Sequence, residues 1–218
     1  MPLKEFTVRI PDEEGIVVAA KIPTPAADSV GWNTLMRIDG SVDAFMTVNG
    51  TYLPLQNGRT VQDCYTAYVG KPSFRDKHGK CEFSVFAYRH LIDGCAVGTK
   101  MQFKDIDSGE YKTLRTFWNY SVAVLDPSFV KNEIALAPDG VITVDTMSKM
   151  MRERCNLHLI LEGVLSEILE KSPFSEMRKR SSEISQKIIA EFINSGAVNH
   201  TGFQLKAMTL GNIELVEG

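Results

Sequence analysis

The segment Leu114–Leu125 reads LRTFWNYSVAVL and is the longest strand candidate in the chain. Its aromatic residues Phe117, Trp118 and Tyr120 fall on both faces of an extended strand, because successive side chains point to opposite sides. Apolar side chains on both faces favour a central position in a sheet that has helices on one face. The following Asp126-Pro127 step ends the strand, because proline has no amide hydrogen to donate to a neighbouring strand.

Shorter stretches of alternating polar and apolar residues precede this segment and predict antiparallel strands. They lie at Phe6–Ile10, Gly15–Lys21, Val42–Val48 and Cys81–Leu91. We expect a hairpin through Pro11–Glu14 to join the first two of these strands. The Asn49-Gly50 pair is the strongest hairpin signal in the chain, because both residues tolerate the positive φ angles of a tight turn.

The spacing of apolar residues changes to three and four after Thr143, which is typical of amphipathic helices. Met147–Leu169 is expected to form one helix of about six turns. Ser172-Pro173 then provides an N-cap and a proline for the start of a second helix, which Gly196 ends. Alternation returns over Gly202–Val216. Strands, two helices and a closing strand, in this order, predict an α+β fold.

The chain has 218 residues, of which 44% are hydrophobic and 23% are charged, enough to bury a sizeable core. We expect a single domain over 1–218. Its N-terminal antiparallel β-sheet is expected in a mainly β sub-lobe over about 1–97. A strand-helix-helix-strand arrangement is expected in an αβ sub-lobe over about 98–218.

The formal net charge is −3 at pH 7, and the longest cationic run is Arg178-Lys179-Arg180. A nucleic-acid ligand is therefore not expected, because such binding depends on an extended basic surface. The N-terminal residues lack the apolar core of a signal peptide, and no stretch approaches the roughly 18 apolar residues of a membrane span. We expect a cytoplasmic protein, with any membrane contact peripheral and at the inner surface.

Sequence motifs that hold nucleotides, zinc or a serine nucleophile are absent from the chain, including G-x-G-x-x-G, G-x-x-x-x-G-K-[ST], H-E-x-x-H and G-x-S-x-G. The cysteines Cys64, Cys81, Cys95 and Cys155 stand singly, which favours reduced thiols over a zinc site. We therefore expect no cofactor, no metal and no catalytic activity.

One cluster leaves an enzymatic alternative open. Asp76, His78, Cys81 and His90 could bring an acid, two imidazoles and a thiol together if their strands adjoin. The other interpretation of the sequence around Asp76 and His78 is a solvated turn. A second polar stretch, Lys104–Glu110, alternates carboxylates before a glycine, but it lacks the length of a calcium loop and predicts an exposed hairpin turn.

Two groups of residues are candidates for an interaction surface. Met147, Met150 and Met151 could adapt to varied partners, or could pack in the core. Arg178, Lys179 and Arg180 could contact acidic lipid headgroups or a partner protein, or could form a solvated helix face.

A series of features from Gly98 onward resembles the SPFH superfamily (stomatin, prohibitin, flotillin, HflK/C), also called band 7. The series is Gly98-Thr99, Asp105, Asp126-Pro127, Val141–Asp145 before the first helix, and Arg152 within it. The chain most resembles the bacterial branch labelled virion-core-protein-like. Its later segments SEISQKIIAEFINSGA, Gly202–Leu205 and Gly211–Leu215 are similar to the closing helix and strand of that family.

The resemblance implies a non-enzymatic scaffold domain that forms homo-oligomers and recruits or organises partner proteins, with peripheral lipid contact as a further expectation. It implies no catalytic residue. One alternative is a structural component of a phage or other protein particle. A second alternative is an enzyme with a site near Asp76, His78 and His90.

Overall fold

The computed structural model describes residues 3–10, 16–23, 30–73, 75, 77, 81–137 and 139–216. The chain forms two compact units, and the fold is α+β as predicted. Unit 1 comprises Met1–His90 and Pro127–Thr143, and unit 2 comprises Leu91–Asp126 and Val144–Gly218. This division differs from the sub-lobes expected over about 1–97 and 98–218, because residues 91–97 belong to unit 2 and Pro127–Thr143 belongs to unit 1.

Unit 1 is built on an antiparallel sheet whose strand order is β5-β4-β6-β2-β9. These strands are β2 (Val17–Ile22), β4 (Val42–Val48), β5 (Thr51–Pro54), β6 (Phe83–Arg89) and β9 (Val141–Thr143). A further pair is parallel and consists of β1 (Glu5–Val8) and β3 (Leu35–Ile38). The predicted hairpin between β1 and β2 is wrong, because β1 pairs with β3 and β2 pairs with β6 and β9. Residues 11–14 themselves lie outside the described part of the chain.

The turn between β4 and β5 confirms the strongest hairpin prediction. Asn49 and Gly50 have φ angles of 48° and 83° and connect the paired residues Val48 and Thr51. Positive φ at both central positions matches the right-handed twist of the strands that the turn joins. On either side of the turn, Val48 pairs with Thr51, Thr47 with Tyr52 and Met46 with Leu53.

Two helices of unit 1 were not predicted from the sequence: α1 (Val61–Tyr68) and α3 (Pro127–Leu136). A capping box begins α1, since Thr60 Oγ1 accepts a hydrogen bond from the Asp63 amide at 3.1 Å. In return, the Thr60 amide donates to Asp63 Oδ2 at 3.2 Å. Helix and sheet residues share one core, which includes Val8, Met36, Met46, Leu53, Val61, Val85 and Ala87.

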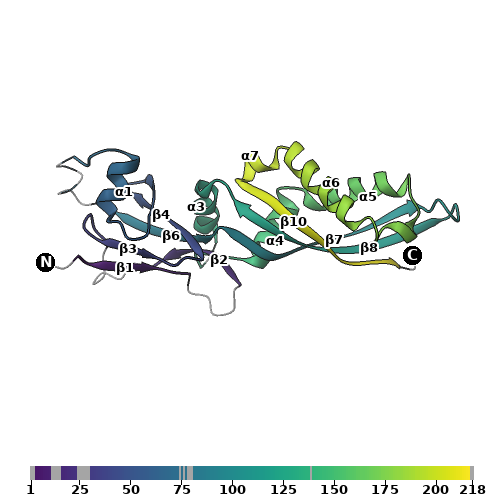
Figure 1. Ribbon diagram of the computed structural model, residues 1–218, viewed down its shortest axis with the longest axis horizontal. Helices are drawn as coiled ribbons and strands as arrows, with labels where there is room; N and C mark the ends of the chain where they lie inside the picture. Colours follow the sequence, from purple (N-terminus) through teal and green to yellow (C-terminus); the bar gives the residue numbers. More distant parts are fainter. Residues whose placement is uncertain are drawn as a thin grey trace. The chain divides into compact units, whose positions relative to one another are not determined.

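Unit 2 contains a sheet of three strands with fourteen residues each: β7 (Leu91–Lys104), β8 (Tyr111–Val124) and β10 (Phe203–Val216). Both neighbours run antiparallel to β8, which is the central strand (Figure 1). Leu114, Trp118 and Val122 on one face of β8 are fully buried, whereas Phe117 on the other face is 45% exposed. The central position predicted for this segment is confirmed.

Helices pack against the buried face of this sheet. They are α4 (Val144–Glu153), α5 (Leu157–Leu169), α6 (Ser181–Asn194), the short α7 (Ala197–Thr201) and the 3-10 helix η2 (Phe174–Glu176). In unit 2, α4 and α5 contact β7, while α6 contacts β10 (Figure 1). On the other face of β8, Arg115, Phe117 and Asn119 are exposed, which shows that no helix covers that face there.

The prediction of one helix over Met147–Leu169 is wrong, because the structure divides it into α4 and α5. Asn156 lies between them in the left-handed conformation, with φ of 52° and ψ of 32°. Asparagine adopts this conformation more readily than most residues, so it breaks the helix while the apolar spacing continues across the break. The second predicted helix also starts late: Pro173 precedes η2, and α6 begins at Ser181.

Candidate functional site

The three methionines of the predicted interaction surface are core residues. Met147 and Met151 are 1% and 0% exposed, and Met150 is 8% exposed. All three lie on the face of α4 that is buried. They are not available to a partner protein, so the core interpretation of these residues holds and the surface interpretation is wrong.

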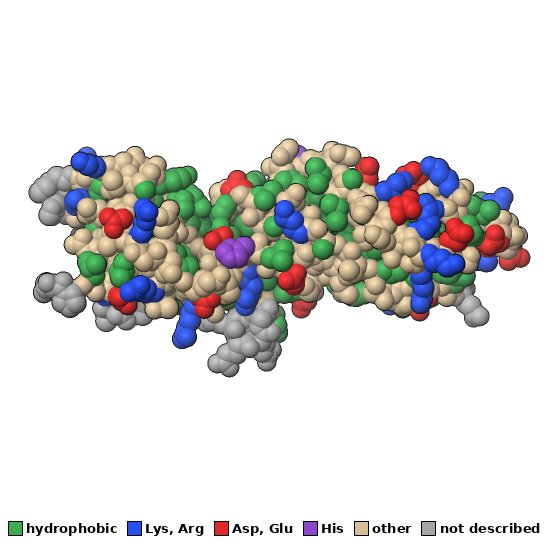
Figure 2. All heavy atoms as spheres, viewed as in Figure 1, with side chains coloured by type: hydrophobic (Ala, Val, Ile, Leu, Met, Phe, Trp, Pro, Cys, Tyr) green, Lys and Arg blue, Asp and Glu red, His purple; other side chains and the backbone are tan. Residues whose placement is uncertain are grey.

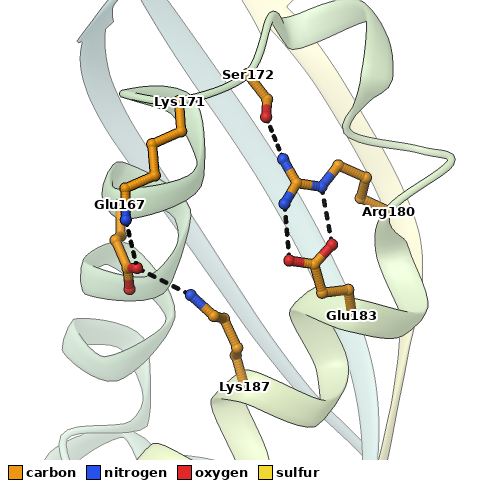
Figure 3. A network of polar contacts seen from close by, with 6 residues as sticks. All are labelled: Glu167, Lys171, Ser172, Arg180, Glu183 and Lys187. Atoms are coloured by element: carbon orange, nitrogen blue, oxygen red, sulfur yellow. Dashed lines mark hydrogen bonds and ion pairs between the residues drawn. The ribbon is translucent and has the colours of Figure 1, made fainter.

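The cationic run holds unit 2 together at two of its three positions. Arg178 Nη2 donates to the Ile213 carbonyl of β10 at 3.3 Å. The guanidinium of Arg180 donates to both carboxylate oxygens of Glu183, at 2.9 and 2.7 Å, and to the Ser172 hydroxyl (Figure 3). Lys179 is exposed. Arg178 and Arg180 therefore have hydrogen-bond partners inside unit 2, while Arg178 and Lys179 are exposed.

The residues of the enzymatic alternative do not form one site in the described part of the chain. Asp76 and His78 lie outside the described residues. Cys81 lies two residues before the seven-residue β6 and His90 directly follows it, so the strand separates them. His90 Nδ1 lies 2.8 Å from Asp43 Oδ2, and hydrogen bonding to that carboxylate raises the pKa of His90. Among the described residues, no group of three or more His, Cys, Asp or Glu could hold a metal ion.

The Lys104–Glu110 segment is the turn between β7 and β8, as predicted. Asp105 Oδ2 accepts hydrogen bonds from the Ser108 hydroxyl at 2.8 Å and from Lys112 Nζ at 2.6 Å. The Asp105 carboxylate is buried and is occupied by these donors, which lower its pKa. It serves to close the hairpin.

The outer edge of β7 is the first of two surfaces of unit 2 that can receive a partner. From Cys95 to Lys104 the strand pairs with β8 in continuous register. The Ala96 amide donates to Ser148 Oγ at 3.2 Å, so it points away from β8. Backbone groups alternate along a strand, and the amides of Gly98, Lys100 and Gln102 therefore point outward as well. Within the described ranges these three amides have no hydrogen-bond partner. We call residues 98–104 the β7 edge.

A shallow hollow of about 700 Å³ lies along this edge. Its cationic lining residues come from three elements: Lys100 of β7, Arg115 of β8 and Arg152 of α4. His158 at the start of α5 also lines it and contacts the Arg152 carbonyl at 3.1 Å through Nδ1. The carboxylate of Glu162 already accepts a hydrogen bond from the Thr99 hydroxyl. Glu214 of β10 also lines the hollow and lies 3.9 Å from Arg115, so Lys100 and Arg152 are its lining cations outside an ion pair of the described residues.

The hollow continues over the open face of the sheet at Phe117. Glycines flank the ring on both neighbouring strands, Gly98 on β7 and Gly211 on β10. A Cβ at Gly98 would lie 3.2 Å from the Thr116 carbonyl oxygen and 3.8 Å from Phe117 Cδ2. Because Gly98 has no side chain, the ring of Phe117 is accessible from the β7 edge.

A groove between α5 and α6 is the second surface. It encloses about 450 Å³ and is lined by Ile160, Gly163, Val164, Glu167, Glu191, Asn194 and Ser195. A Cβ at Gly163 would meet no atom within 4 Å, so the floor of the groove is open at this position. Leu159, one turn before Gly163 on the same helix, is 53% exposed, and Ile193 of α6 is 47% exposed. We call this surface the α5–α6 groove.

Charged side chains gather around these helices, as Figure 2 shows for the part of unit 2 that carries α5, α6 and the β7–β8 hairpin. Glu167 Oε1 of α5 lies 2.9 Å from Lys171 Nζ and 3.0 Å from Lys187 Nζ of α6 (Figure 3). These two hydrogen bonds lower the pKa of Glu167 to about 2. The network joins α5 to α6 at one end of the groove.

Sequence reasoning did not find either surface. Lys100 and Lys104 lie on one face of β7, and lysines are typical of edge strands. Only the order of the strands in the sheet shows that β7 lies at the edge. Three positions of the family resemblance, Gly98, Thr99 and Arg152, line the hollow at the β7 edge.

Comparison with known proteins identifies no family for this chain: no protein-family model and no curated protein matches it. Of the described helices, none is both long enough and apolar enough to cross a membrane.

Proposed function

We propose that this protein is a non-enzymatic scaffold that associates with copies of itself and recruits partner proteins. The observation that carries the proposal is the α5–α6 groove, where Gly163 leaves the floor open and the exposed Leu159 lies one turn earlier on α5. A helix interior is a costly place for glycine, by roughly 0.5–1 kcal/mol relative to alanine. Close approach of a second helix is one use for a position without a side chain.

A second copy is the occupant that the groove suits. Two α5 helices that cross at Gly163 would bury both Leu159 side chains in a self-complementary contact, as a two-fold dimer requires. The groove is also lined by Glu191 of α6 and by Glu167, which lies one turn after Gly163 and is already paired with Lys171 and Lys187. The contact must bury roughly 800 Å² per copy to be specific.

The test is the mass of the purified protein in solution, measured by light scattering after gel filtration over a concentration series. We expect a mass above the 24.3 kDa of one chain. Gly163→Arg places a large side chain in the groove at a position where a Cβ meets no atom within 4 Å, and it is expected to lower the mass to that of one chain. Gly163→Ala is the graded comparison, because a methyl group should weaken the association less than an arginine side chain does.

A mass of 24.3 kDa at the highest concentration would contradict the proposal. If Gly163→Arg leaves a large mass unchanged, self-association takes place through a surface other than the α5–α6 groove. Flotation with anionic lipid vesicles then separates a peripheral membrane scaffold at the cytoplasmic surface from a component of a protein particle, since only the scaffold rises with the lipid.

A further inference from the structure

We propose that the β7 edge binds an extended acidic segment of a partner protein, which adds to the sheet as a fourth strand beside β7. This inference rests on the recruitment part of the proposed function and names the chemistry of the partner. An added strand gains affinity from backbone hydrogen bonds and specificity from the side chains at alternate positions.

The backbone of β7 sets the length of the site. The outward amide of Ala96 already donates a hydrogen bond to Ser148 Oγ, so the free edge begins after this residue. The Asp105 turn closes it on the other side. Between these limits the outward amides of Gly98, Lys100 and Gln102 are available to the carbonyl groups of a bound strand.

The opposite edge of the same sheet is protected. The strand β10 has two register irregularities, between Leu205 and Ala207 and between Leu210 and Asn212. Ser185 donates to the Met208 carbonyl at 2.9 Å, and Arg178 donates to the Ile213 carbonyl at 3.3 Å. Bulges and capped backbone groups discourage strand addition. The β7 edge lacks both features from Gly98 onward.

The charges around the β7 edge select an acidic partner. Lys100 and Arg152 line the hollow outside the ion pair of Arg115 with Glu214, and Lys104 follows at the end of the strand. A second copy of β7 would place lysines against lysines, which is unfavourable across paired strands. Glutamate and aspartate on one face of the added strand would instead pair with these cations.

An apolar residue fits the partner strand opposite Gly98. Because Gly98 has no side chain, a long apolar side chain on the added strand can reach across it toward the exposed ring of Phe117. Gly98, Lys100 and Lys104 lie on the same face of β7, so the expected partner segment carries acidic residues at alternate positions opposite the two lysines and one apolar residue on that same face opposite Gly98.

The experiment measures binding of a fluorescent peptide of about ten residues to the full chain by fluorescence anisotropy. Glutamate alternates with valine in this peptide, except that leucine replaces one glutamate as the residue opposite Gly98. A peptide of equal charge with proline at alternate positions cannot form the ladder and should bind at least about tenfold more weakly. Lys100→Glu and Arg152→Glu are each expected to weaken binding by about tenfold. Lys179→Glu, the same charge change at an exposed position outside the hollow, should leave binding unchanged.

The backbone contribution is tested at Gln102. Gln102→Pro removes one outward amide, and proline is tolerated on an edge strand whose N–H faces solvent. Gln102→Ala keeps the amide and serves as the matched control. We expect the proline variant to lose binding and the alanine variant to keep it.

Equal binding by Gln102→Pro and the wild-type chain would overturn the proposal, as would equal binding of the two peptides. Displacement of the peptide by a single-stranded oligonucleotide of the same charge would also overturn it, because it would show binding by charge alone. The scaffold function has a separate readout, the mass in solution. Gly163→Arg should lower the mass and still bind the peptide, whereas Gln102→Pro should keep the mass of the assembly and lose peptide binding. Loss of peptide binding with an intact assembly therefore rejects this inference alone.

Discussion

The ring of Phe117 occupies the space that a side chain at Gly211 would need. A Cβ at Gly211 would lie 3.0 Å from Phe117 Cδ1 and 3.3 Å from both the Phe117 carbonyl oxygen and Asn119 Nδ2. Gly211 lies at a register irregularity of β10, directly beside the central strand. The aromatic residue and the glycine thus fit together on the open face of the sheet.

Gly211→Ala is expected to lower the free energy of unfolding by about 1–3 kcal/mol, because the new methyl group overlaps with the ring and the backbone of β8. Denaturant unfolding measures this change. The ring accounts for the shortest contact, so the cost of Gly211→Ala should be smaller when Phe117→Ala is already present. An equal cost in both backgrounds would show that the ring does not exclude the side chain.

Helix α1 is expected to depend on its capping box. Thr60→Ala removes the hydroxyl that accepts the Asp63 amide, and it should destabilise unit 1 by about 1 kcal/mol. Thr60→Ser retains the acceptor and should cost much less. Hydrogen exchange of the α1 amides, compared with those of β8 in unit 2, measures the effect. Equal exchange rates in Thr60→Ala and the wild-type chain would contradict it.

The pH dependence of unit 2 is expected to reflect Glu167. Its pKa falls from an ordinary value of 4.5 to about 2, because Lys171 and Lys187 donate to the carboxylate. A group with a depressed pKa contributes stability above its unfolded value and loses that contribution as the pH falls through the folded value. Stability should therefore decline between about pH 4.5 and pH 2.

Glu167→Gln should flatten this decline, measured as the denaturant midpoint at each pH. Glu170→Gln removes the same charge three residues further along, where the described residues show no ion pair, and serves as the control. High salt should weaken the effect in the wild-type chain, because the carboxylate is exposed. If Glu167→Gln has the same pH profile as the wild-type chain, the ion pairs of Glu167 do not cause the decline in stability.

His90 is expected to titrate above its ordinary pKa of 6.5, because its ring bonds to Asp43. A raised pKa means that the protonated form stabilises unit 1 at low pH, and that this contribution is lost as the pH rises through the folded pKa. Nuclear magnetic resonance of the imidazole signals measures the value directly. Asp43→Asn should return the pKa toward 6.5. A value that does not move would mean that the ion pair is absent in solution.

Local patterns predicted many elements of the fold correctly. The alternation in β8 and the Asn49-Gly50 turn both depend on a few adjacent residues, so sequence alone identifies them. The break at Asn156 was missed because apolar residues continue at helical spacing on both sides of it. The helices α1 and α3 were missed because they are short and bury only two residues each within their bounds.

The candidate surfaces were harder to predict than the elements. The methionines of α4 were assigned to a surface as one alternative, but burial depends on which face of the helix meets the sheet. The β7 edge and the α5–α6 groove each combine residues from separate elements, and spacing along the chain does not reveal such combinations.

The sequence by itself determined the α+β class and the central place of β8, because the period of the apolar residues sets how many faces of an element must be buried. Only the tertiary structure decided that β1 pairs with β3, that β7 keeps an open edge and that Gly211 lies beside Phe117. The physical reason is that an apolar face can be buried against many partners. Which partner it meets depends on packing among residues that are far apart in the chain.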